Sequence, residues 1–230
     1  MTEEKVIPKT NLIGVILQIA SVWVLSDIGY YIFLPALGFN GGYNVHPVQI
    51  TIYYLIWTII AIFAFKDILK DKVVLEKRLG TYIPLVVGNI FIVIYVFYIL
   101  PLLPTITWTP PWMPPSELLN ATTWYFLPKS IEIFLQQILL LALVISFLDN
   151  QYKFKTTAIW CALLFGGSHL LLVFSGGFMY ATVFTIIAVV ASFIFTYLLL
   201  EVRNGFLYSY FLHWIFYAFV VVVTKLIFKV

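Results

Sequence analysis

Three ionisable side chains, Glu132, His169 and His213, lie in three different hydrophobic stretches whose other residues are almost all uncharged. Burying one such group in hydrocarbon costs about 3 kcal/mol on insertion scales, so each position needs a partner or a function. A carboxylate and two imidazoles that converge from separate helices can activate a water molecule or hold a metal ion. These three residues are therefore the candidate functional site.

The composition decides what kind of fold must position them. Hydrophobic residues make up 63% of the chain and charged residues 10%, whereas soluble domains contain about 25% charged residues. We therefore expect an all-α, polytopic transmembrane bundle that forms one integral membrane domain over residues 1–230. The net charge of +3 is too small and too dispersed to indicate nucleic-acid binding, so the expected partners are membrane lipid and a membrane-associated substrate.

Seven stretches are long enough to cross a bilayer, which takes roughly 20 apolar residues. They cover residues 11–37, 48–65, 81–103, 129–148, 156–174, 179–200 and 206–228. Of the 13 Lys and Arg residues, all except Lys129, Lys225 and Lys229 fall on one side of a seven-span arrangement. The positive-inside rule then predicts a cytoplasmic N-terminus, an external C-terminus and a location in the cell membrane.

The longest loop on the predicted outer side covers residues 104–128 and combines prolines with tryptophans. Prolines prevent a regular helix, while tryptophans favour the headgroup region of the bilayer. The pattern is typical of an interfacial flap or a re-entrant loop, and equally of an ordinary aromatic belt.

Each candidate residue also has a purely structural interpretation. Gln136 follows Glu132 by four residues and shares its helix face, so this polar ridge either lines a site or binds neighbouring helices. His169 follows Gly166 and Gly167, which allow another backbone or a substrate to approach closely. His213 lies among aromatic residues and is either functional or simply hydrogen-bonded within the core.

Asp27 and Cys161 also have structural interpretations. Asp27 lies one turn before Tyr30 and Tyr31, whose hydroxyls would satisfy its carboxyl, although it could also belong to an ion path. Cys161 is the only cysteine, lies in an apolar run, and is expected to pack as a small apolar residue. With no glycine-rich phosphate loop and no paired cysteines, the sequence predicts no nucleotide or organic cofactor.

Phe165-x-x-x-His169 and the later His213 resemble motifs of the CPBP family of intramembrane proteases, also called Abi or type II CAAX-protease-like proteins. That family carries Glu-Glu-x-x-x-Arg, then Phe-x-x-x-His, then His-x-x-x-Asn on successive helices. The order of the motifs fits over roughly residues 129–217. The second motif matches in full, but Tyr217 stands where Asn is expected, and Glu132 alone represents the first motif.

The resemblance implies roles for four residues. Glu132 and His169 would hold and deprotonate a water molecule that attacks a peptide carbonyl, without a bound metal or other cofactor. His213 would stabilise the oxyanion, with Tyr217 donating in place of the missing Asn. The implied activity is a glutamate-type endopeptidase that cleaves a membrane-associated protein. Because Glu132 lies near the outer end of its span, the site would open outward or toward the bilayer midplane.

Three alternatives stay open at this stage. Glu132 and the two histidines match the ligand set of a catalytic zinc, although the chain has no His-Glu-x-x-His motif. The incomplete motifs favour a non-catalytic scaffold or immunity-type protein of the same fold. Asp27, Glu132 and the histidines could instead form the relay of a small proton-coupled transporter, although no inverted repeat supports it.

Overall fold

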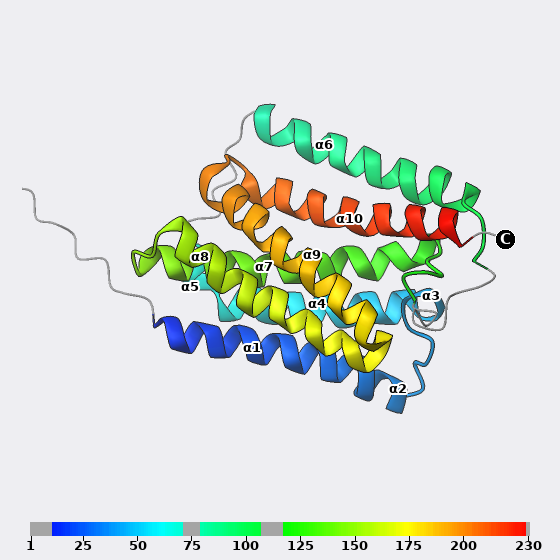
Figure 1. Ribbon diagram of the computed structural model, residues 1–230, viewed down its shortest axis with the longest axis horizontal. Helices are drawn as coiled ribbons and strands as arrows, with labels where there is room; N and C mark the ends of the chain where they lie inside the picture. Colours follow the sequence, from blue (N-terminus) through cyan, green and yellow to red (C-terminus); the bar gives the residue numbers. More distant parts are fainter. Residues whose placement is uncertain (1–10, 71–78, 107–116, 229–230) are drawn as a thin grey trace, which may run out of the picture.

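The computed structural model describes residues 11–70, 79–106 and 117–228, and within these ranges the chain is helical and contains no strand. Long helices lie side by side in one bundle (Figure 1). Six of them are long and apolar enough to cross a membrane, so the prediction of an all-α integral membrane protein is confirmed. The start of the first helix is set by Asn11, whose side chain accepts a hydrogen bond from the Gly14 N–H.

The N-terminal half contributes three crossings. Its elements are α1 (Leu12–Ile28), π turn η1 (Gly29–Phe33), α2 (Leu34–Ala36), α3 (Gly42–Val45), α4 (Pro47–Ala64), α5 (Lys66–Leu69), α6 (Leu79–Ile94), π turn η2 (Tyr95–Ile99) and 3-10 turn η3 (Leu100–Leu102). Pro47 opens α4, where the absent N–H has no intrahelical partner to lose. The predicted boundaries of these three spans agree with the structure to within a few residues.

The C-terminal half supplies the candidate site. Its elements are 3-10 turn η4 (Thr123–Tyr125), α7 (Phe126–Asp149), α8 (Phe154–Cys161), π turn η5 (Ala162–Gly166), 3-10 turn η6 (His169–Leu172), α9 (Val173–Glu201) and α10 (Gly205–Ile227). Within α9 the backbone bends at Gly177, whose φ of +78° only glycine adopts readily.

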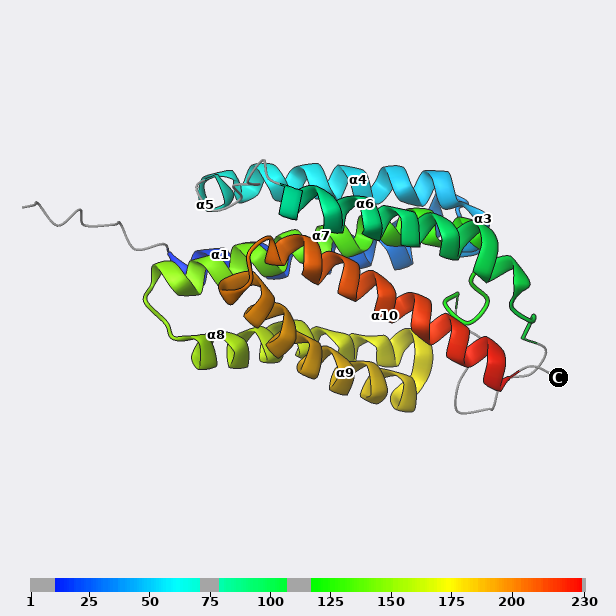
Figure 2. The same cartoon turned by 90° about the horizontal axis from the view of Figure 1, so that it is seen from above.

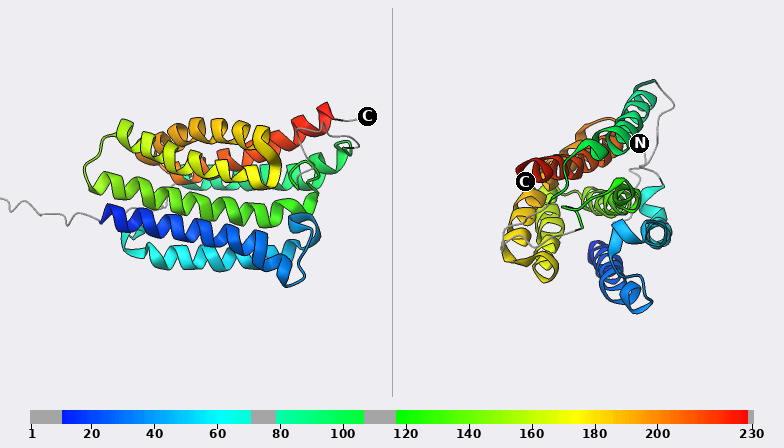
Figure 3. Two further views of the ribbon diagram at one scale, coloured as in Figure 1. Left: turned by 60° about the horizontal axis from the view of Figure 1, so that its bottom comes forward. Right: turned by 90° about the vertical axis from the view of Figure 1, so that its right-hand side faces the viewer.

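Helix α7 is the core of the bundle. In its membrane-length window 72% of the residues are buried, compared with at most 33% in the other five windows. The helix packs against α1, α4 and α10 and is enclosed by its neighbours in the end-on view (Figure 3). Any polar side chain on α7 must therefore find its partners inside the protein.

The predicted fifth span is the one crossing that is not a regular helix. Helix α8 passes through η5 and η6, so its hydrogen-bond pattern changes twice before α9 begins. Together these elements still run the length of the bundle (Figure 1). The backbone is irregular around Gly166 and Gly167, where no side chain fixes the helix. Six regular helices among the described residues are long enough to cross a membrane, and the irregular crossing brings the bundle to about seven crossings.

The alternating crossings place the start of α1 and the end of α10 at opposite ends of the bundle (Figure 2). The described basic residues divide accordingly. At the end where α1 begins, basic residues lie in the connections or in the first turns of helices: Lys66, Lys70, Lys153, Lys155 and Arg203. Lys129 and Lys225 lie toward the other end. The charge asymmetry inferred from the sequence is thus preserved in three dimensions.

Candidate functional site

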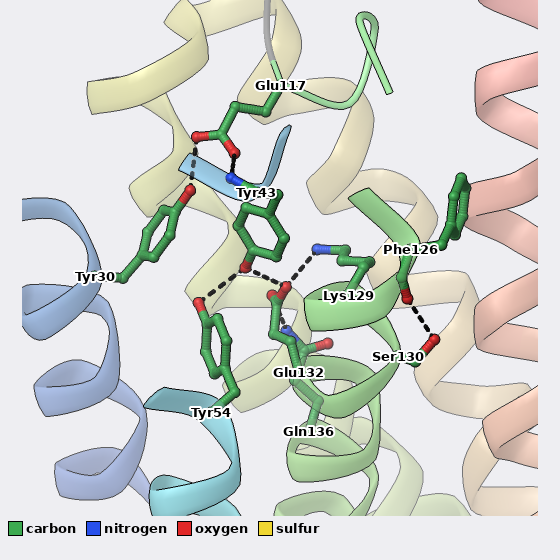
Figure 4. A network of polar contacts seen from close by, with 9 residues as sticks. All are labelled: Tyr30, Tyr43, Tyr54, Glu117, Phe126, Lys129, Ser130, Glu132 and Gln136. Carbon is green, nitrogen blue, oxygen red and sulfur yellow. Dashed lines mark hydrogen bonds and ion pairs between the residues drawn. The ribbon is translucent and has the colours of Figure 1, made fainter. Parts of the chain in front are cut away.

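Glu132 lies in the second turn of α7 and accepts three hydrogen bonds (Figure 4). Its Oε2 accepts from the Tyr43 hydroxyl at 2.6 Å and from Lys129 Nζ at 2.8 Å, while Oε1 accepts from Gln136 Nε2 at 2.9 Å. The bond from Gln136 is the one that the four-residue spacing predicts. The carboxylate is therefore compensated by one cation and two neutral donors.

Lys129 is the partner that the sequence interpretation missed, since we counted it only as a basic residue on the outer side. Its side chain is 9% exposed and that of Glu132 is 14% exposed, so their ion pair is largely shielded from the surroundings. Lys129 Nζ also lies 4.1 Å from the centre of the Tyr217 ring. The three-residue spacing between Lys129 and Glu132 on one helix was the signal that could have revealed the pair.

A row of tyrosine hydroxyls extends the network toward the N-terminal half. The oxygens of Tyr43 and Tyr54 are 3.0 Å apart. Because Tyr43 gives its only hydroxyl proton to Glu132, Tyr54 must be the donor in this second bond. Burial and the charge of Glu132 raise the pKa of the Tyr43 phenol well above its ordinary value, which keeps this donor protonated.

A second carboxylate, Glu117, fixes the short helix that carries Tyr43 (Figure 4). Its Oε1 accepts from the Tyr30 hydroxyl at 2.6 Å and its Oε2 from the Tyr43 backbone N–H at 2.7 Å. The Glu117 carboxylate lies against Gly42, where a Cβ would overlap it and where φ is +62°. We call Glu117, Gly42, Tyr30 and the Tyr43 N–H the Glu117 clasp.

The described part of the loop predicted over residues 104–128 is packed in part, whereas its Trp124 is 59% exposed. Leu118, Leu119 and Ala121 are buried, and Asn44 accepts hydrogen bonds from the backbone and hydroxyl of Thr122. The predicted flap or re-entrant element rested mainly on the prolines and tryptophans of residues 107–116, which lie outside the described residues. Residues 117–122 are held to α3 at both of their ends, by Glu117 and by Thr122.

His213 and Tyr217 lie one turn apart on α10, and their rings stack with centroids 5.4 Å apart and planes at 23°. His213 Nδ1 lies 3.1 Å from the Nε2 of Gln137, which is fully buried on α7. The aromatic surroundings expected for His213 are present, because the Phe195 ring of α9 also lies near it, with 5.4 Å between centroids. His213 is thus both packed and held by one amide.

His169 begins η6, and its Nδ1 lies 2.8 Å from the carbonyl oxygen of Phe165 in the preceding turn. The neighbouring glycines behave differently from one another. A Cβ on Gly166 would meet the backbone of Val189 in α9 at 3.2 Å, whereas a Cβ on Gly167 would meet nothing within 4 Å. Gly166 therefore permits the close approach of two backbones that the sequence predicted, and this approach holds the irregular crossing against α9.

A cavity of about 540 Å³ lies between the irregular crossing, α9 and α10. Its size is within the usual range for small-molecule sites. His169, His213 and Tyr217 line it together with apolar side chains from all three segments: Phe165, Phe184, Ile186, Ile187, Ala188, Val190, Ala191, Ile194, Phe195, Leu212, Ile215, Phe216 and Phe219. Helices α9 and α10 meet at one end and diverge toward the other (Figure 2), and side chains of both line this cavity.

The four predicted site residues therefore fall into two groups. His169, His213 and Tyr217 share the cavity, while Glu132 shares a much smaller one with Asp27. Among the described residues no hydrogen bond joins Glu132 to either histidine. The groups meet through Lys129, which pairs with Glu132 and lies over the Tyr217 ring.

The expected bond from Tyr30 to Asp27 is not formed, because the Tyr30 hydroxyl donates to Glu117 instead. Within residues 11–70, 79–106 and 117–228, no three His, Cys, Asp or Glu side chains are arranged to hold a metal ion, so the zinc alternative has no ligand set there. Cys161 is fully buried, as expected for a small apolar residue. Comparisons with protein-family models, curated proteins and solved structures gave no match to this chain.

Proposed function

We propose that the protein is a CPBP-like intramembrane endopeptidase whose substrate enters the cavity between α9 and α10. The single observation that carries this proposal is the meeting of His169, His213 and Tyr217 in one largely apolar cavity. His169 and His213 are 44 positions apart in the sequence, and they are the two histidines that the motif resemblance selects. An apolar cavity of this size with a few polar groups is the usual form of a substrate site.

The proposed chemistry uses the two groups of residues in different roles. A water molecule held between Glu132 and His169 would give a proton to Glu132 and attack the peptide carbonyl, whose oxygen would take the negative charge on the His213 side of the cavity. Return of that proton from Glu132 to the amide nitrogen would then break the C–N bond and release the amine. Glu132 Oε1 accepts from Gln136 alone, and a carboxylate oxygen has capacity for a second donor. A water bound there would give Glu132 its role as base without breaking the pair with Lys129.

A non-catalytic membrane protein of the same architecture is the second candidate, and a specific observation favours it. Glu132 is held by Tyr43, Lys129 and Gln136, and among the described residues it makes no hydrogen bond to either histidine. A carboxylate compensated in this way stabilises a fold without any chemistry. In that case the cavity would bind a ligand or a partner helix rather than convert a substrate.

The orientation belongs to the same proposal. The end of the bundle that gathers Lys66, Lys70, Lys153, Lys155 and Arg203 would face the cytoplasm of the cell membrane. Glu132 lies toward the opposite end, so the site would open to the membrane interior or to the outer side. A cysteine-accessibility map of both ends in intact cells would test this orientation.

The activity is tested with purified protein in nanodiscs and a quenched fluorescent peptide library. Because Glu132→Gln alone would leave a buried Lys129 without its partner, we pair it with Lys129→Met in one variant. We expect this double variant and His169→Ala each to lose on the order of 10²-fold or more in cleavage rate. His46→Ala, in the turn before α4 and outside the cavity, is the matched control.

Cleavage that persists in both variants would overturn the roles of Glu132 and His169. Cleavage that is abolished by chelators would instead assign a metal-dependent reaction. If no peptide is cleaved by the wild-type protein while both variants remain folded, the non-catalytic candidate is preferred.

A further inference from the structure

The cavity is accessible from the membrane-facing side of the bundle. Three of its lining side chains, Ile186, Val190 and Phe219, are 61%, 56% and 63% exposed on the surface of α9 and α10. In a protein that spans a bilayer, such apolar side chains face lipid chains rather than water. A molecule in the membrane can therefore reach the cavity sideways, between the two diverging helices (Figure 2).

The contact with Gln137 fixes which nitrogen of His213 carries the proton. An amide nitrogen donates only, so His213 Nδ1 accepts from Gln137 Nε2, and in the neutral ring the hydrogen is on Nε2. The reversed amide would face Nδ1 with its oxygen and leave the buried amino group unpaired. The present orientation leaves Gln137 Oε1 and one of the two amide N–H groups without a described partner, whereas the reversed amide would leave both N–H groups unpaired.

His169 has the opposite arrangement. The carbonyl oxygen of Phe165 accepts only, so His169 Nδ1 carries the hydrogen and donates it. In the neutral ring Nε2 is then an unprotonated acceptor. Both Nδ1 atoms are turned toward the protein, His213 toward α7 and His169 toward its own backbone. The cavity consequently has one Nε2 acceptor and one Nε2–H donor on its two histidines.

The lack of charged side chains in the cavity restricts the class of ligand that it can bind. None of its lining residues is Asp, Glu, Lys or Arg. Lys129, whose Nζ lies over the Tyr217 ring, is already paired with Glu132. A charged headgroup would therefore lose its hydration without gaining an opposite charge, which is costly in an apolar environment. A neutral group with one donor and one acceptor matches the two histidines.

We propose that this cavity binds a neutral membrane lipid with a single hydroxyl headgroup, whose O–H donates to His169 Nε2 and whose oxygen accepts from the His213 Nε2–H. The apolar remainder of the lipid lies between α9 and α10. The inference goes beyond peptide cleavage, since it concerns binding and needs no reaction.

The experiment uses photo-crosslinking of the full-length protein in nanodiscs with four probes that share one alkyl chain and one diazirine. The probes are a fatty alcohol, its methyl ether, the corresponding fatty acid and a fatty trimethylammonium. The ether keeps the oxygen acceptor and lacks the donor. Peptide mapping locates the labelled residues, and competition with unlabelled fatty alcohol measures occupancy.

We expect the alcohol to label α9 and α10 best and the methyl ether to bind about fivefold more weakly, as the loss of one neutral hydrogen bond predicts. His169→Phe should weaken binding of the alcohol by the same factor and leave binding of the ether unchanged. His213→Phe should weaken binding of both probes. His46→Phe, outside the cavity, should change neither. Because the ether tests the His169 bond in the wild-type protein, the conclusion does not depend on the folding of a variant.

Equal labelling by alcohol and ether would overturn the inference and leave only an apolar crevice. Stronger labelling by the fatty acid or the ammonium would also overturn it, because the cavity would then favour a charged group. Labelling outside α9 and α10 would place the lipid elsewhere. None of these results depends on peptide cleavage, so the binding inference and the proposed endopeptidase can fail separately.

Discussion

The two polar regions of this bundle differ in how completely their hydrogen bonds are used. Around Glu132, the carboxylate, the Lys129 ammonium and the hydroxyls of Tyr43 and Tyr54 are paired with one another (Figure 4). Around His169 and His213, one nitrogen of each ring is bound and the other has no partner among the described residues. The first arrangement is typical of a structural network, and the second is typical of a site that awaits a ligand.

The difference shows why a buried charge is by itself poor evidence of catalysis. In an apolar interior an ionised group without partners is costly, so most such groups acquire them for stability alone. Glu132 met that requirement with three donors. The histidines met it with one partner each, which leaves chemistry available at Nε2. Measurements of stability and of ligand binding should therefore respond to different substitutions.

The largest effect on stability is expected from Lys129→Met. Removing one member of a shielded ion pair leaves an uncompensated charge and costs about 3–5 kcal/mol. The double variant Lys129→Met/Glu132→Gln should recover most of this loss, because no charge then remains. Unfolding in mixed detergent micelles measures both values. A double variant as unstable as the single one would show that the charge is not the cause.

A smaller loss is expected from Tyr43→Phe. The Tyr43 hydroxyl donates to a carboxylate, and such bonds contribute about 1.5–3 kcal/mol. Tyr53→Phe is the matched control, because its hydroxyl donates to the neutral carbonyl of Ser26 and should cost about 0.5–1.5 kcal/mol. Equal losses of unfolding free energy in the two variants would show that the bond from Tyr43 to Glu132 contributes no more than a neutral one.

The Glu117 clasp can be separated from ordinary backbone strain by two glycine substitutions. Gly38→Ala and Gly42→Ala both place a side chain at positive φ, which costs about 1–2 kcal/mol. Only at Gly42 would the new Cβ also displace Glu117 from Tyr30 and Tyr43. Because each hydrogen bond to a carboxylate contributes about 1.5–3 kcal/mol, we expect Gly42→Ala to lose at least about 1.5 kcal/mol more than Gly38→Ala. If the two variants lowered the melting temperature equally, the Glu117 clasp would make no separate contribution to stability.

The smallest effect on stability is expected from His169→Phe. The ring is only partly buried and bonds only to its own backbone, so the change should lie within about 0.5 kcal/mol of zero, as for most substitutions away from tightly packed sites. The same variant should weaken binding of the fatty alcohol. If His169→Phe lost several kcal/mol of stability but bound the fatty alcohol as tightly as the wild type, the comparison between the two regions would be reversed.

The sequence alone was sufficient for the architecture, because the spans depend on local composition. Stretches of roughly 20 apolar residues are read without any tertiary information, and so is the placement of Lys and Arg at one end. The pairing of Gln136 with Glu132 also followed from helical spacing. The irregular crossing was predicted only as a span, since the approach of α9 to Gly166 depends on a segment more than 20 residues away.

What the tertiary structure decided is which polar residues meet. The sequence placed Glu132 and both histidines in one group, but the fold separates them by the Lys129 and Tyr217 contact. Tyr43, Tyr54 and Glu117 come from other elements, so no local pattern could assign them to Glu132 or to the clasp. The proton positions on His169 and His213 likewise depend on partners that folding supplies. Hydrophobic patterning acts along the chain, whereas hydrogen-bond saturation is settled only when distant helices pack.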